Sequence, residues 1–204
     1  MRQFYIILMA TFALTACTTV VETNPPRSAV EELLISTAAD RAVTQMHFDL
    51  PQGASVFVDA GNLAGLGSDG KYVIAAIDAR LLHQGLRLAA DRKSAQAILA
   101  LRAGALSTDQ KDFLIGIPQF KVPVPLSSSA LTLPQIALYE DQDQEGVAKL
   151  AAVGYDAKSG AILGKTMGAA RFGFAHNDKQ TVLIFFSWRE NDSLPKNEEN
   201  PLSP

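Results

Sequence analysis

Residues 65–70 (Gly-Leu-Gly-Ser-Asp-Gly) have the glycine spacing of a dinucleotide-binding loop, and Asp91 follows about twenty residues later. Two features oppose this interpretation. In a dinucleotide-binding motif, the first glycine makes a tight turn directly after the strand. Here six residues separate Gly65 from Val58, which lies in an expected strand. Asp69 would also place a carboxylate where a pyrophosphate binds at a helix N-terminus. We therefore expect a flexible loop followed by a capped helix, and no bound cofactor.

The acidic segment 141–146 (Asp-Gln-Asp-Gln-Glu-Gly) resembles the first half of a calcium-binding loop. Counting from Asp141, glycine stands correctly at position six, but position twelve, which should supply a bidentate carboxylate, is Ala152. We expect a solvated turn that enters a strand. The histidines lie apart in the sequence without metal-ligand spacing, at His47, His83 and His176.

The sequence contains no catalytic motif that we can identify. A Gly-x-Ser-x-Gly elbow is absent, although catalytic triads can be assembled by folding, so a degenerate enzyme stays open as the least favoured alternative. Three aromatic residues near the C-terminus could form a platform for carbohydrate or peptide: Phe185, Phe186 and Trp188. A terminal strand that completes the core explains these residues more simply. The prediction is a non-enzyme with no catalytic residue, no cofactor and no metal site.

The N-terminus has the features of an export signal. Arg2 precedes an apolar run from Phe4 to Leu14 that is too short to span a bilayer, and small residues follow it. The ending at 14–17 (Leu-Thr-Ala-Cys) resembles the lipobox of bacterial lipoproteins. This resemblance implies cleavage between Ala16 and Cys17 and acylation of Cys17, which would anchor the mature chain in a membrane. An ordinary signal peptide and an uncleaved short anchor are the alternatives.

Thr18 follows the expected lipidated cysteine. In the enterobacterial sorting pattern that this resembles, Asp at that position retains lipoproteins in the inner membrane. Thr18 therefore implies the inner leaflet of the outer membrane, facing the periplasm. The net charge is −3, and acidic and basic residues are interspersed. The sequence therefore shows no cluster of basic residues that would predict nucleic-acid binding. The expected partners are the membrane, through the lipid, and an envelope protein or a second copy of this chain.

Composition and the positions of prolines divide the chain into four segments. Residues 1–16 are the expected signal peptide, and 17–27 are the lipidated N-terminus with a proline-bearing tether. Residues 28–190 have the length and hydrophobic content of a single α+β domain. Residues 191–204 are polar and proline-bearing, which predicts a disordered tail.

The first part of the domain predicts an N-terminal helix and one strand–helix–strand crossover unit. Ser28 and Glu31 have the spacing of a capping box, and Gly85 is well placed to end the second helix in a left-handed conformation. The expected elements are a helix from Ser28 to near Gln45, a strand at 55–60, a helix capped by Ser68 or Asp69, and strands at 86–88 and 97–103.

The last third predicts a C-terminal antiparallel meander that completes one mixed sheet. Residues 147–156 and 161–174 flank a turn at 157–160, which has glycine at its end. Asn177-Asp178 predicts a second turn. Residues 181–188 are apolar at nearly every position, which predicts a strand covered on both faces.

Residues 113–139 form a proline-rich apolar arm between these two regions. They contain four prolines and only one charged residue, Lys121. Proline cannot donate to a central ladder, so we expect an edge strand, an extended loop or a surface arm. A partner-binding arm and a lid over the domain's own sheet both stay open.

Four stretches look like an uncharacterised family of small bacterial lipoproteins: residues 23–27, residues 33–42, the turn at 116–118, and residues 181–188. The motifs of that family carry no assigned chemistry. More loosely, the crossover unit and the hairpin at 155–160 look like α+β lipoproteins of curli secretion and exopolysaccharide export. We expect a non-catalytic scaffold or an assembly and secretion accessory that binds a protein. A small-molecule or glycan-binding module, using a groove beside residues 61–70, is the alternative.

Overall fold

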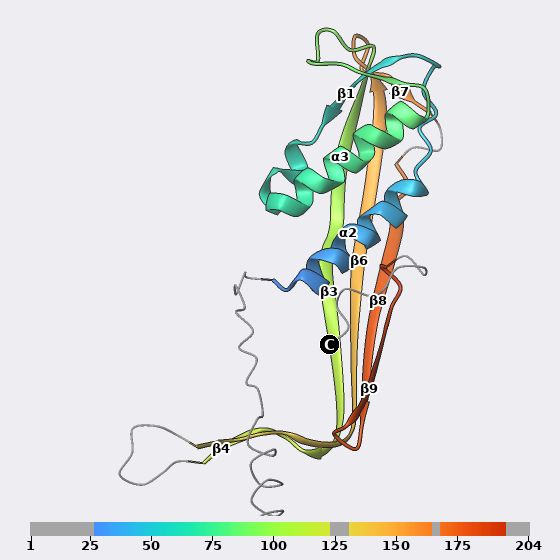
Figure 1. Ribbon diagram of the computed structural model, residues 1–204. Coiled ribbons are helices and arrows are strands. Elements are labelled where there is room, and N and C mark those ends of the chain that lie inside the picture. Colours follow the sequence, from blue (N-terminus) through green and yellow to red (C-terminus); the bar gives the residue numbers. More distant parts are fainter. Residues whose placement is uncertain (1–26, 123–130, 165–167, 195–204) are drawn as a thin grey trace, which may run out of the picture.

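The computed structural model describes residues 27–122, 131–164 and 168–194. It shows a long, narrow sheet with two helices packed on one face of its upper half (Figure 1). The helices are α2 (Ala29–Thr44) and α3 (Gly67–His83), and a 3-10 helix, η1 (Gly61–Leu66), precedes α3. The strands are β1 (Ser55–Asp59), β2 (Arg87–Leu88), β3 (Ala97–Ile117), β4 (Phe120–Val122), β5 (Leu131–Leu133), β6 (Ile136–Asp156), β7 (Ile162–Leu163), β8 (Arg171–Val182) and β9 (Phe186–Asn191).

The main sheet has seven strands in the order β2-β1-β3-β6-β8-β9, and β7 pairs with β6. Strand β1 runs parallel to β2 and β3, with α3 in the crossover, whereas β3, β6, β8 and β9 form an antiparallel meander. Strands β4 and β5 make a separate hairpin. The predicted α+β domain, with one crossover unit and a C-terminal meander, is confirmed.

Local signals in the sequence fix the start of α2 and the turn after β6. Ser28 Oγ accepts from the amide of Glu31 (3.2 Å), and Glu31 Oε2 accepts from the amide of Ser28 (2.7 Å), so the predicted capping box is present. Asp156 Oδ1 accepts from the amide of Ser159 (2.7 Å), and Gly160 has a φ of +72°. Gly85, with a φ of +80°, follows α3 as predicted.

Helix α2 lies close to the sheet because two strand residues beneath it are glycines. A Cβ on Gly146 of β6 would overlap the Leu34 carbonyl, and one on Gly173 of β8 would overlap the carbonyl of Ala38. Small residues on both sides of this contact allow the close approach. The core beneath the two helices is otherwise aliphatic, and its largest fully buried side chains are Leu34, Leu63, Ile77, Leu81, Leu99, Leu101 and Leu150.

Beyond the helices, the strands β3, β6, β8 and β9 continue as a sheet extension that neither of the described helices covers (Figure 1). Strands β3 and β6 are 21 residues each, and their outer halves pair from Ser107↔Val147 to Ile117↔Ile136. The strands β8 and β9 continue the extension beside β6. The β4–β5 hairpin, which we call the arm, bends away from the end of this extension.

The structure corrects several expected elements in this region. Asn177 and Asp178 lie inside β8, and the turn is at 183–185, within the stretch predicted to be one strand. The acidic segment 141–146 lies inside β6 instead of a turn. These two errors have one cause: polar residues were interpreted as turns, whereas this part of the extension is a sheet that is polar on both faces.

The expected arm at 113–139 is also shorter than predicted. Residues 113–117 belong to β3 and residues 136–139 to β6, with prolines only outside these strands, whereas 123–130 lie outside the described residues. At the C-terminus, β9 ends at Asn191 and Arg41 Nη1 donates to Asp192 Oδ2 (2.9 Å). Strand β9 and the contact of Asp192 with Arg41 therefore lie one and two residues past the boundary expected at residue 190.

Candidate functional site

The glycine-rich segment 65–70 forms the end of η1 and the first turn of α3, which begins without the predicted side-chain cap from Ser68 or Asp69. A Cβ on Gly70 would overlap the carbonyl of Leu63, so this glycine is required for packing between η1 and α3. Asp91 accepts from the amide of Ser94 (2.8 Å) in its own turn.

The acidic and histidine candidates do not assemble a metal site. Within the described part of the chain, no group of three or more His, Cys, Asp or Glu side chains could hold an ion. His176 Nε2 lies 3.9 Å from Glu145 Oε1, and His47 Nε2 lies 3.4 Å from Asp49 Oδ1, while His83 ends α3. Ala16 and Cys17, the predicted cleavage and lipidation residues, lie outside the described residues.

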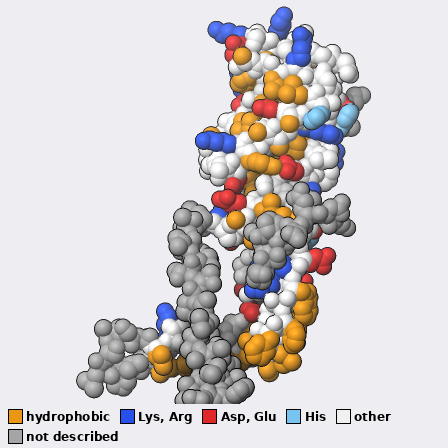
Figure 2. All heavy atoms as spheres, in the orientation of Figure 1, with side chains coloured by type: hydrophobic (Ala, Val, Ile, Leu, Met, Phe, Trp, Pro, Cys, Tyr) orange, Lys and Arg blue, Asp and Glu red, His pale blue; other side chains and the backbone are white. Residues whose placement is uncertain are grey.

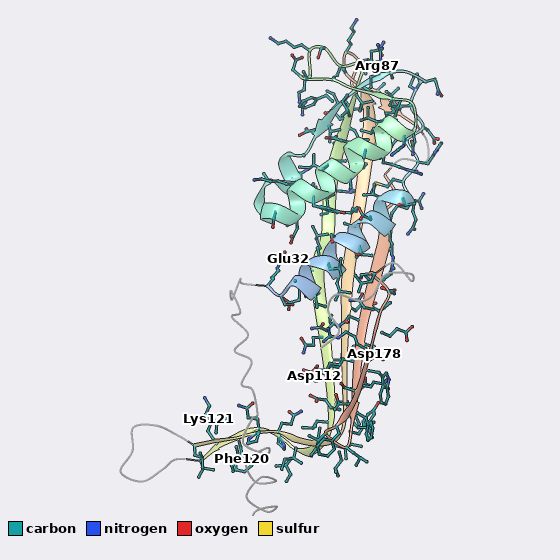
Figure 3. All side chains as sticks on the ribbon, viewed as in Figure 1. Glu32, Arg87, Asp112, Phe120, Lys121 and Asp178 are labelled. Atoms are coloured by element: carbon teal, nitrogen blue, oxygen red, sulfur yellow. The ribbon has the colours of Figure 1, made fainter. Side chains whose placement is uncertain are left out.

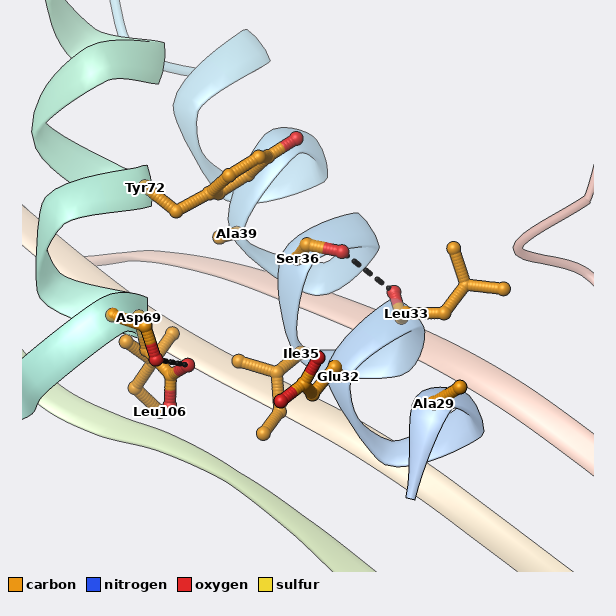
Figure 4. Close-up of a pocket in the computed structure, with 10 residues that line it drawn as sticks. Ala29, Glu32, Leu33, Ile35, Ser36, Ala39, Asp69, Tyr72 and Leu106 are labelled. Carbon is orange, nitrogen blue, oxygen red and sulfur yellow. Dashed lines mark hydrogen bonds between the residues drawn. The ribbon is translucent and has the colours of Figure 1, made fainter. Parts of the chain in front are cut away.

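A pocket of about 430 Å³ lies between α2, α3 and Leu106 of β3 (Figure 4). Two of its polar side chains have partners, since Ser36 Oγ donates to the Leu33 carbonyl (3.0 Å) and Asp69 pairs with Arg27. The carboxylate of Glu32 also lines the pocket, on its exposed side. Tyr72 donates to Asp40 (2.8 Å), and burial together with this bond raises the pKa of Tyr72 to about 12. The pocket therefore offers an apolar wall with few free polar groups to orient a ligand.

The most unusual surface is the end of the sheet extension farthest from the helices. We call residues 113–117, 136–139 and 182–188 the apolar end; they include no Asp, Glu, Lys or Arg. Large hydrophobic side chains gather there in Figure 2. Ten such side chains are exposed on the apolar end, and they are Phe113, Ile115, Ile117, Ile136, Leu138, Leu183, Ile184, Phe185, Phe186 and Trp188. The adjoining arm adds Phe120, Leu131 and Leu133.

The turn at the tip of the apolar end has an unfavourable sequence for its backbone. Leu183 and Ile184 have φ values of +51° and +67°, a conformation that favours Gly and Asn and is an outlier for a β-branched residue. Phe185 follows with 84% of its surface exposed. Strain and exposed apolar area thus coincide at one turn, which is a pattern that points to function.

Aromatic rings mark the boundary of the apolar end. Phe113 and Tyr139 meet edge to face, with their ring centroids 6.2 Å apart. Trp188 pairs with Gln180 of β8, and Gln180 pairs in turn with Asp141 of β6. The indole therefore lies at the level where the sheet changes from apolar to charged.

Behind this boundary lies a polar band, which comprises residues 107–112, 140–146, 176–181 and 189–191. Asp143, Asp178 and Glu190 stand directly opposite one another on β6, β8 and β9, and so share one face. Asp178 and Asp112 of this band are labelled in Figure 3. Burial raises the pKa of Asp178, and the neighbouring carboxylate of Asp141 raises it further. The other face carries amides, where Asn177 donates to Gln144 (2.9 Å) and Gln144 donates to Gln110 (3.3 Å).

The expectation that residues 181–188 form a strand covered on both faces is wrong. Phe185, Phe186 and Trp188 are exposed and do not complete the core. The sequence carried one signal that could have revealed this, because 181–188 lacks the alternation of a half-buried strand and lies between two polar runs. Within the described residues, no helix is long and apolar enough to cross a membrane.

These features define an α+β protein with two parts. We call the part of the sheet that α2 and α3 cover, together with these helices, the head; the other part is the sheet extension, which ends in apolar side chains. The chain belongs to a family of unknown function (DUF6655), whose model matches residues 12–166. A comparison with curated proteins gives no match, and neither does a comparison with solved structures.

Proposed function

We propose that this chain is a non-catalytic docking protein of the bacterial cell envelope. A lipid on Cys17 would hold it on the inner leaflet of the outer membrane, facing the periplasm. From there it would also attach to an envelope component through the apolar end. This proposal keeps the expected scaffold or assembly role and assigns the contact to a specific surface.

The observation that carries the proposal is the exposure of ten large hydrophobic side chains at one end of the molecule. Apolar area concentrated in this way marks an interaction surface more often than a tolerated feature of a monomer. The strained turn at Leu183 and Ile184 supports it further, because Gly or Asn there would give the fold a lower energy.

The alternative function is small-molecule binding in the pocket between α2 and α3. The pocket has the size of a ligand site, at about 430 Å³. Two of its polar side chains are engaged by residues outside its lining, in the Arg27–Asp69 ion pair and the Tyr72–Asp40 hydrogen bond. We therefore rank this function below docking.

Docking can be tested in cells without the confounding effect of the lipid. The Cys17→Ser chain, exported behind an ordinary cleavable signal peptide, should remain partly with the sedimenting envelope. Phe185→Ser combined with Phe186→Ser should move it to the soluble fraction. Leu82→Ser is the matched control, because Leu82 is an exposed apolar residue of the head (53%).

The proposal predicts the same melting temperature for all three proteins, because the substituted side chains are exposed and cost little to truncate. A double variant that stays with the envelope as well as its parent does would contradict the proposal. A parent chain that is fully soluble without its lipid would contradict it equally.

A further inference from the structure

We propose that the component bound by the apolar end is a lipid bilayer, into whose interface the tip of the extension inserts. This inference rests on the proposed docking function and names its partner. Lipid chemistry fits the shape and the boundary of this surface better than a protein partner does.

The apolar end is a projecting tip and not a flat patch. Ile115 and Leu114 are consecutive in β3 and so point to opposite faces of the extension. Phe185 projects from the turn itself, with 84% of its surface exposed. A fluid hydrocarbon phase can surround such a tip on all sides, whereas a protein would need a matching socket.

The boundary of the apolar end has the composition of a membrane interface. Tyr139 and Trp188 stand where apolar residues give way to charged ones, and both side chains join an apolar ring to a polar group. Tyr and Trp are enriched at this depth in membrane proteins. Charged residues begin immediately behind them, at Glu140 and Arg189.

The strand edges limit how deeply the tip can enter. Strand β1 pairs with β3 only as far as Ala100, and in the described residues no strand covers the outer edge of β9. Backbone groups at these edges would be unsatisfied in hydrocarbon, which has no water to bond them. Insertion should therefore stop in the interfacial layer, with Trp188 near the headgroups.

The predicted lipid anchor can reach the same bilayer. Leu34 of α2 lies over Gly146, which pairs with Thr108 of β3. From that level to Ile117 the extension is about 30 Å long, at about 3.3 Å per residue. The ten residues from Cys17 to Arg27 can span at most about 35 Å. A two-point attachment, with the head held away from the membrane, is therefore sterically feasible.

Charge in the polar band predicts which lipids are preferred. Asp143, Asp178 and Glu190 share one face of the extension, and the nearest base in their row is Lys111. Anionic headgroups would be repelled by this face, so zwitterionic lipids should bind better. The difference should shrink as salt screens the repulsion.

Trp188 is the only tryptophan in the chain and lies at the proposed interface, so it reports binding directly. The probe is a vesicle of phosphatidylethanolamine and phosphatidylcholine, added to the unlipidated mature chain, residues 18–204. We expect the emission of Trp188 to shift to shorter wavelength and to saturate with lipid. Lipids brominated near the headgroup should quench it more than lipids brominated near the chain ends.

The combined Phe185→Ser and Phe186→Ser variant should lose the vesicle-dependent shift, whereas Leu82→Ser should keep it. Replacing part of the lipid by phosphatidylglycerol should weaken binding at low salt. Stronger quenching from the chain ends would overturn the shallow geometry. A shift that depends on protein concentration and needs no vesicles would identify a second copy as the partner and overturn the lipid assignment.

An emission spectrum that does not change at lipid excess would also overturn the inference. The docking function would then survive only if envelope retention of the Cys17→Ser chain still required Phe185 and Phe186, which would indicate a protein partner. If retention did not require them, both proposals would fail.

Discussion

Val182 of β8 pairs directly with Phe186 of β9, so only Leu183, Ile184 and Phe185 connect the two strands. The turn between β8 and β9 is thus made of three large apolar residues, and two of them have a positive φ. Ordinary hairpins place Asn or Gly at such positions. The sequence of this turn is better explained by the contact that we propose for it than by the backbone it must adopt.

Replacing Leu183 by Asn and Ile184 by Gly should make the protein more stable and less active in docking. Relief of left-handed strain at the two residues should raise the free energy of unfolding by about 1–2 kcal/mol. Denaturant unfolding measures that gain, and the vesicle assay with Trp188 measures the loss. A turn that serves only the fold would gain stability while its docking stayed intact, which would contradict our account.

Gly173→Ala should destabilise the head strongly. The added methyl group would overlap the Ala38 carbonyl and force α2 away from the sheet, at a cost of about 1–3 kcal/mol or more. Gly65→Ala is the matched control, because a Cβ at Gly65 meets no atom within 4 Å. Equal melting temperatures for the two variants would show that the contact between α2 and β8 is looser than described.

Asp178→Asn should stabilise the protein at neutral pH and not at acid pH. Because the pKa of Asp178 is raised in the folded state, the folded protein binds the proton more tightly than the unfolded chain does. Its unfolding free energy therefore falls as the pH rises from the ordinary Asp value of about 3.9 through the raised pKa. The asparagine variant escapes this loss. Thermal melts at several pH values test it, and a benefit confined to low pH would contradict the assignment.

Lipidation of Cys17 predicts a defined N-terminal peptide. Mass spectrometry of the membrane fraction should find that Ala16 and the preceding residues are absent and that Cys17 is acylated. The Cys17→Ser chain should lack that acylated peptide. An intact, unmodified Met1 terminus in the mature protein would contradict both the cleavage and the lipid.

Sequence reasoning was reliable where short-range chemistry decides structure. Ser28 and Glu31 form a capping box, and Asp156 with Gly160 forms a turn, because each motif needs only residues that are neighbours in the chain. The strand–helix–strand unit followed from hydrophobic periodicity and from Gly85. These signals were sufficient for the α+β class and for one mixed sheet.

The same reasoning failed in the extension, where neighbouring strands determine structure. Asn177 and Asp178 have turn propensity, yet pairing with Gln144 and Asp143 keeps them in β8. The turn at Leu183 and Ile184 carries no Gly or Asn, so local chemistry could not reveal it. The exposure of residues 183–188 was missed as well, because a run of apolar residues was interpreted as core.

The central claim is that the apolar end makes contact with another component in the cell. A photoreactive phenylalanine analogue placed at Phe185 tests this directly, with the same analogue at Leu82 as the control, since both positions are exposed. After irradiation of living cells, mass spectrometry should find lipid or partner adducts from position 185 well above those from position 82. Equal, background-level adducts from the two positions would contradict the claim.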